Sequence, residues 1–178
     1  MSYALAGYLI DLEKLRSAVG SRDKALIKAV IDEDPKAFAA APSKDDISLK
    51  DALTHLIMGE PMDARSAHQY GYALEQFCRH LGTRVESRRW DTVRLEALED
   101  TGIEKLMDKN GPPVALPSIR DFPAIGHVPA SAIRAALDEV QERYDAATDD
   151  DLRDLLSDYE GWLLAALEQN KSLVLFYY

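Results

Sequence analysis

The two ends of the chain are apolar runs that read as short β-strands. They cover residues 3–11 (YALAGYLID) and 172–178 (SLVLFYY). A lone strand is not stable, so we expect the two ends to pair with each other or to join one small sheet that helices cover. The last strand is predicted to be held down as far as Tyr178. If it lies at a sheet edge, that edge is where another chain would add a strand.

Between these ends, apolar residues recur at the spacing of amphipathic helices. Residues 12–19 form a short predicted helix that Gly20 ends. Ser48 and Asp51 resemble a capping box that opens another helix, and a third is predicted over residues 66–81. Two further helices close the helical part of the chain. The strongest apolar stripe, in the second of them, consists of Leu152, Leu155, Leu156, Tyr159, Trp162, Leu163, Ala166 and Leu167.

Two segments interrupt the helical pattern. Residues 34–47 are predicted to be a loop that Phe38 fastens to the core. Residues 110–129 (NGPPVALPSIRDFPAIGHVP) are rich in proline and glycine, which excludes a long helix there. Val114–Leu116 is the part of this segment that we expect to pair as a short strand. Long loops are more often functional or mobile than short ones, so residues 110–129 are the first place to look for a site.

Together these patterns predict an α+β fold. We expect a predominantly helical single domain over residues 1–178, with a small sheet that includes the N-terminal and C-terminal strands. The chain has 178 residues, enough to bury a substantial core as one domain.

The charge and the cysteine content indicate which binding partners and which compartment to expect for the protein. The formal net charge is −10, which disfavours nucleic acid and anionic membrane surfaces and favours basic protein partners. The one cysteine, Cys78, excludes an internal disulfide and fits a reducing compartment. The sequence has neither a recognisable signal peptide nor an apolar run long enough to span a bilayer. These observations predict a cytoplasmic protein.

Candidate site residues are few. His127 and Asp121 lie in the irregular segment, where polar residues are better functional candidates than in a core. The alternative is that this loop only packs and caps the following helix. His55 follows Asp51 by four residues, so both lie on one side of a helix and could form an acid–base pair; alternatively Asp51 serves the helix N-terminus. Tyr72 lies off its helix's apolar stripe and is a candidate for a binding surface.

No motif predicts a metal or a cofactor. The spacing of His55, Glu60, Asp63 and His68 fits neither HExxH nor a short zinc pattern. Nucleotide-binding glycine motifs, the nucleophile elbow and CxxC are also missing from the sequence. We therefore assign no catalytic residue, and we expect no cofactor and no metal.

Several segments resemble a known family. The opening GYLIDLEKL, the helix ending DALTHLIMGEP, the segment IGHVPASAIRAALDEV and the tail LLSDYEGWLLAALEQNKSLVLFYY are similar in order to the YfbM-like bacterial proteins of unknown function. The run QYGYALEQFCRHLG at residues 69–82 resembles a related group of uncharacterised bacterial proteins. The resemblance implies an α+β fold and carries no activity.

The leading functional hypothesis is a non-enzymatic, cytoplasmic protein-binding protein that uses an acidic face, such as the one expected at Asp149–Asp151. In its sharpest form it is an immunity or antitoxin-like protein that neutralises a basic toxin. The alternative is a small-molecule-binding protein or hydrolase with its site under the 110–129 loop, using His127 and Asp121 with His55. A homodimer through C-terminal tyrosines is compatible with either hypothesis.

Overall fold

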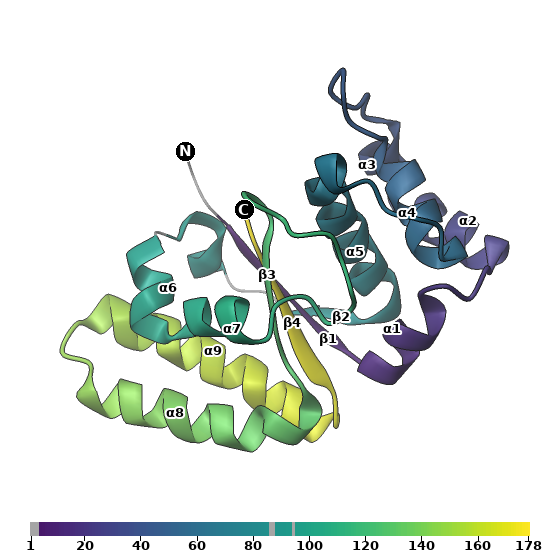
Figure 1. Ribbon diagram of the computed structural model, residues 1–178. Helices are drawn as coiled ribbons and strands as arrows, with labels where there is room; N and C mark the ends of the chain where they lie inside the picture. The colour runs from purple at the N-terminus through teal and green to yellow at the C-terminus, as the bar shows by residue number, and fades with distance from the viewer. Residues whose placement is uncertain (1–3, 86–87, 94) are drawn as a thin grey trace.

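Four antiparallel strands form one sheet through the middle of the molecule, in the spatial order β2-β1-β4-β3 (Figure 1). The computed structural model describes residues 4–85, 88–93 and 95–178. The strands are β1 (Leu5–Ile10), β2 (Thr83–Val85), β3 (Ala124–Val128) and β4 (Ser172–Tyr177).

The predicted pairing of the two ends is confirmed. β1 runs antiparallel to β4, with Leu5 opposite Tyr177 and Ile10 opposite Ser172. The backbone of Ala4 extends this ladder, because its N–H donates to the Tyr178 carbonyl at 3.2 Å. β4 also pairs with β3 on its other side. It is therefore a central strand, and the edge that we considered for strand addition does not exist there.

Helices cover both faces of the sheet (Figure 1). On one face lie α1 (Leu12–Ala18), α2 (Lys24–Glu33), α3 (Pro35–Ala39), α4 (Leu49–Met58) and α5 (Ala67–Leu81). On the other lie α6 (Leu95–Thr101), α7 (Ile103–Lys109), α8 (Ile133–Ala146) and α9 (Asp150–Glu168). Short 3₁₀ turns link them: η1 (Ala64–Ser66), η2 (Arg88–Thr92) and η3 (Ala130–Ala132). The α+β fold predicted from the pattern is confirmed.

Two hydrophobic cores lie on opposite faces of the sheet. Successive side chains of a strand point to opposite faces, so Tyr8 and Ile10 pack with α4 and α5, whereas Leu9 packs with α9. β4 divides in the same way, with Phe176 in the first core and Leu175 in the second. This explains why β1 and β4 are apolar at nearly every position: both of their faces are buried.

Helix ends follow the capping residues in the sequence. The Ser48 hydroxyl accepts the Asp51 amide at 3.0 Å, as predicted for the start of α4. Gly20 and Gly59 adopt φ values of +74° and +69° after α1 and α4, a conformation that favours glycine. The prediction of a plain loop over 34–47 is wrong in part, because Asp34 caps the short α3 and Pro35 occupies its first turn.

The largest departure from prediction is β3. Val114–Leu116 forms no strand; Ala124–Val128 does, inside the segment that we predicted to be a loop. β3 has only five residues (AIGHV) and lies between Pro123 and Pro129, so the sequence around it is typical of a loop. Gly126 interrupts its apolar pattern as well. Gly126 is needed because α7 crosses β3 there: a Cβ at this position would lie 2.9 Å from the backbone N of Met107.

Candidate functional site

The four candidate residues lie in three separate places. His55 belongs to α4, His127 to β3, and Tyr72 and Asp121 share one cleft. Neither of the clefts that Asp121 lines includes His55 or His127. The structure thus brings two of the four together, and it separates Asp121 from the histidines that a hydrolytic site would use.

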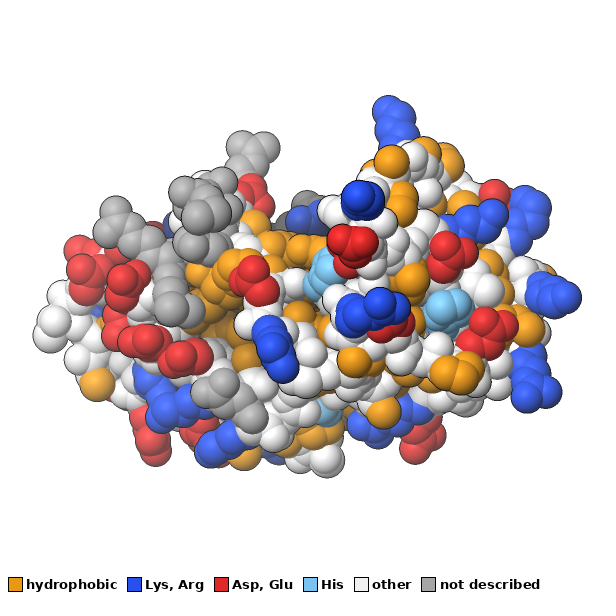
Figure 2. Space-filling view, turned by 45° about the horizontal axis from the view of Figure 1, so that its top comes forward, with side chains coloured by type: hydrophobic (Ala, Val, Ile, Leu, Met, Phe, Trp, Pro, Cys, Tyr) orange, Lys and Arg blue, Asp and Glu red, His pale blue; other side chains and the backbone are white. Residues whose placement is uncertain are grey.

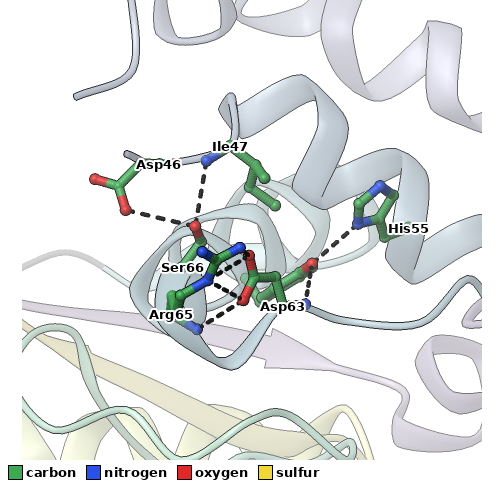
Figure 3. A network of polar contacts seen from close by, with 7 residues as sticks. Asp46, Ile47, His55, Asp63, Arg65 and Ser66 are labelled. Carbon is green, nitrogen blue, oxygen red and sulfur yellow. Dashed lines mark hydrogen bonds and ion pairs between the residues drawn. The ribbon is translucent and has the colours of Figure 1, made fainter. Parts of the chain in front are cut away.

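His55 is part of a polar network that fastens the chain after α4 (Figure 3). The Tyr70 hydroxyl accepts the Asp63 N–H at 2.9 Å and lies 2.9 Å from His55 Nδ1. On its other side, His55 Nε2 lies 3.7 Å from a Glu60 carboxylate oxygen. Asp51 serves the start of α4, as in the alternative to a His55–Asp51 pair: it lies in the first turn, and its carboxylate accepts the Ser48 hydroxyl at 2.7 Å. This histidine contacts residues that position the loop.

His127 is buried on β3 and connects that strand to the end of α7. Its Nδ1 donates to the Gly111 carbonyl at 2.9 Å, and the Asn110 side chain donates to the His127 carbonyl at 2.9 Å. These two bonds satisfy polar groups at the outer edge of the sheet. The prediction of His127 as a loop residue is wrong, since it lies in β3. Its hydrogen bonds join this strand to the residues that follow α7.

Tyr72 and Asp121 face one another across an open cleft of about 810 Å³, which we call the Tyr72 cleft. One wall comes from η1 and the start of α5, and the other from the segment that leads into β3. The lining residues are Ala64, Arg65, Ala67, His68, Tyr72, Ser118, Ile119, Arg120, Asp121 and Phe122.

Close packing holds the two walls of the Tyr72 cleft in place. A Cβ at Gly71 would lie 2.8 Å from both Ile119 Cδ1 and Pro123 Cγ, so the absence of a side chain lets this segment rest directly on α5. The Phe122–Pro123 peptide bond is cis. Phe122 is further fixed edge-on against the Tyr177 ring, with centroids 5.7 Å apart. The cleft is therefore formed by packed segments.

The Tyr72 cleft is lined by positively and by negatively charged side chains. Arg65 forms a fork on Asp63, with its Nη2 2.8 Å from a carboxylate oxygen (Figure 3), and this pair holds the pKa of Asp63 below its usual value. His68 Nε2 lies 3.3 Å from the Asp46 carboxylate. Burial, followed by the negative charges of Asp121 and Glu75, raises the pKa of Tyr72. The Tyr72 hydroxyl is thus a neutral donor at pH 7.

A second depression gathers acidic side chains between α6 and the start of α9. This acidic groove has a volume of about 890 Å³ and is lined by Arg89, Thr92, Val93, Glu96, Ala97, Asp100, Asp149, Asp151, Leu152, Asp154 and Leu155. Arg89 is engaged there by two carboxylates, at 3.1 Å from Asp154 and 3.3 Å from Asp158. Many Asp and Glu side chains lie at this end of the molecule, with some Lys and Arg side chains among them (Figure 2).

Only one side of the acidic groove is predictable from the sequence. Asp149 and Asp151 belong to the acidic run that we singled out, but Glu96 and Asp100 were missed. They stand four residues apart in α6 and thus share a helix face. That spacing is visible in the sequence, but the partner element across the groove, α9, begins about 50 residues further along the chain, and no local pattern indicates that the two meet. Within the described ranges, no cluster of three or more His, Cys, Asp and Glu has an arrangement that could hold a metal ion.

Comparisons with known proteins identify a family without assigning an activity. A family model described as a domain of unknown function (DUF7691) matches residues 1–178. Neither a curated protein nor a solved structure matches the chain. The match is to DUF7691, and none of these comparisons supports the name YfbM. Among the described residues, no helix combines the length and apolar character that crossing a membrane requires.

Proposed function

The chain belongs to the DUF7691 family of unknown function, and from its own surfaces we propose that it is a non-enzymatic protein that binds a basic protein partner through the acidic groove. The observation that carries this proposal is the gathering of five carboxylates, from Glu96, Asp100, Asp149, Asp151 and Asp154, around one depression. In its sharpest form, the partner is a basic toxin that the protein neutralises.

The electrostatics of the groove favour a cationic occupant. Arg89 is the cation in the described lining, and it is already paired with Asp154 and Asp158. Asp150 and Asp151 lie in the first turn of α9, where the helix dipole stabilises negative charge. A field of one sign in a hollow attracts an oppositely charged surface and speeds its association. A lysine or arginine of the partner that enters the groove would meet carboxylates on both walls.

The test compares two triple variants of equal charge. The groove variant is E96Q/D100N/D151N, and the control is E13Q/D45N/E168Q, which removes three exposed carboxylates outside the groove. Asp149 is left intact in both because its side chain caps α9. The partner to use is the purified product of the neighbouring gene. We expect the groove variant to associate about tenfold more slowly than the control at low salt, with a smaller difference at high salt.

Two results would contradict the proposal. If the neighbouring product is not toxic when expressed alone, or does not bind, the toxin form is wrong. If it binds and both triple variants associate equally fast, the acidic groove is not the binding surface.

The alternative function is only partly favoured by the geometry. A hydrolase built on Asp121 with His127 or His55 lacks support, because these histidines make their contacts away from the Tyr72 cleft. Binding of a small molecule near the 110–123 segment keeps support from that cleft. The cytoplasmic location and a relationship to YfbM-like proteins remain proposals; a buried free cysteine fits the first, and the apolar motifs of the terminal segments suggest the second.

A further inference from the structure

We propose that the Tyr72 cleft is a second site, separate from the acidic groove, and that it binds a small planar molecule carrying one anionic group. The proposal starts from the size and lining of the cleft. A volume of about 810 Å³ lies within the range of small-molecule sites, roughly 300–1,000 Å³. The two depressions share none of their lining residues, so the sites can be tested independently.

Arg120 supplies the charge for the anionic group. Of the cationic side chains in the cleft, Arg65 is held by Asp63, and His68 lies against Asp46. Arg120 is exposed and, within the part of the chain that the structure describes, makes neither a hydrogen bond nor an ion pair. A guanidinium presents a planar fork that matches a carboxylate or a phosphate. The cleft therefore contains one cation ready for an anion.

Aromatic rings supply the surface for a planar body. Tyr72 lines the cleft and contacts two other rings: the Tyr178 ring is stacked with it, with centroids 6.3 Å apart and planes at 15°, and the His68 ring lies nearly perpendicular to it at 6.3 Å. Phe122 forms part of the opposite wall and is fixed by Tyr177. Rings that are held in place lose little freedom when a flat ligand stacks on them. The ligand class that fits is therefore a flat ring system.

Asp121 limits the charge of the ligand. Its carboxylate lines the cleft next to Arg120, and its negative charge contributes to the raised pKa of the Tyr72 phenol. A carboxylate accepts a hydrogen bond from an N–H or O–H group of a ligand and repels additional negative charge. The site thus favours a molecule with one anionic group and a donor on its ring, and disfavours polyphosphates and nucleic acid.

Two probe pairs test the proposal and distinguish the sources of the anionic group. Indole-3-acetate carries a carboxylate and adenosine 5′-monophosphate a phosphate; indole-3-acetamide and adenosine are their uncharged counterparts. Binding to the full chain is measured by calorimetry. We expect at least one anionic probe to bind with a dissociation constant below about 1 mM and on the order of tenfold more tightly than its uncharged counterpart. The probe that binds identifies the anionic group.

Matched variants assign the binding to the cleft. R120Q should remove the preference for the anionic probe, whereas R134Q, which changes an exposed arginine of α8, should bind as the wild type does. Y72L should weaken the binding of both members of a pair, with folding checked by circular dichroism. The groove triple variant should bind the probes normally, which separates this proposal from the protein-binding one. The proposal is overturned if neither anionic probe saturates, or if R120Q binds them as tightly as the wild type.

Discussion

Gly126 lies where the backbones of β3 and α7 approach each other closely. A Cβ there would lie 2.9 Å from the Met107 nitrogen and 3.0 Å from the Leu106 carbonyl carbon, and backbone atoms cannot move aside as a flexible side chain can. We expect G126A to lower the free energy of unfolding by about 1–3 kcal/mol, as overpacked sites do. Urea denaturation followed by circular dichroism measures this change.

Gly161 provides the matched control for this substitution. It lies in α9 with no atom within 4 Å of the position where its Cβ would be. G161A should therefore raise the free energy of unfolding by roughly 0.5–1 kcal/mol, because alanine favours the helix. Equal effects of the two substitutions would show that the α7–β3 approach does not constrain position 126.

Single residues were predictable where their role is local. Ser48 and Gly20 act on their own helix ends, so their neighbours in the sequence suffice to assign them. The partners of His127 and Tyr72 come from distant elements, which local pattern does not reveal. Tyr72 and Asp121 were predicted separately as binding candidates. Their shared cleft depends on Gly71, whose lack of a side chain lets residues 119–123 pack against α5. This contact between distant segments has no local signal in the sequence.

At the scale of elements, the start of α9 combines a structural role with a charged surface. Asp149 accepts the Leu152 amide at 3.0 Å, so its side chain caps a helix that contributes several buried side chains to one core. Asparagine caps as well as aspartate but carries no charge. We expect D149A to lower the midpoint of thermal unfolding, by an amount equivalent to about 1 kcal/mol, and D149N to leave it nearly unchanged.

The same pair of variants separates capping from charge. Both remove the carboxylate from the acidic groove, so any property that depends on charge should change equally in D149A and D149N. Thermal unfolding monitored at 222 nm is the readout for the cap. If D149N destabilises the protein as much as D149A does, the charge at the α9 N-terminus, and not the hydrogen bond to Leu152, stabilises this end of the helix.

Elements with a long periodic pattern or a continuous apolar run were predicted well, and β3, which has neither, was not. α5 and α9 repeat their apolar spacing over several turns, so the pattern averages out single exceptions. β3 has five residues, includes a glycine and lies between prolines, so its local signals indicate a loop. Its strand conformation is imposed by β4, which supplies hydrogen-bond partners along its length.

At the scale of the whole molecule, the sheet both separates the two cores and joins them. Both tryptophans, Trp90 and Trp162, lie in the core that α6–α9 cover, with ring centroids 5.2 Å apart. Leu53 belongs to α4 and is fully buried in the other core. Because β1 and β4 contribute side chains to both cores, loss of packing on one face must disturb strands that the other face needs. The chain should therefore unfold as one unit.

The substitution L53A tests this unity across the sheet. Removing a buried leucine side chain should cost about 3 kcal/mol, and the loss arises on the face that contains no tryptophan among the described residues. If the chain is one cooperative domain, urea unfolding of L53A followed by tryptophan fluorescence and by far-ultraviolet circular dichroism should show the same lowered midpoint. A fluorescence midpoint that stays at the wild-type value while the circular dichroism transition moves would mean that the two layers unfold independently. The strands that begin and end the described chain would then be insufficient to couple its two cores.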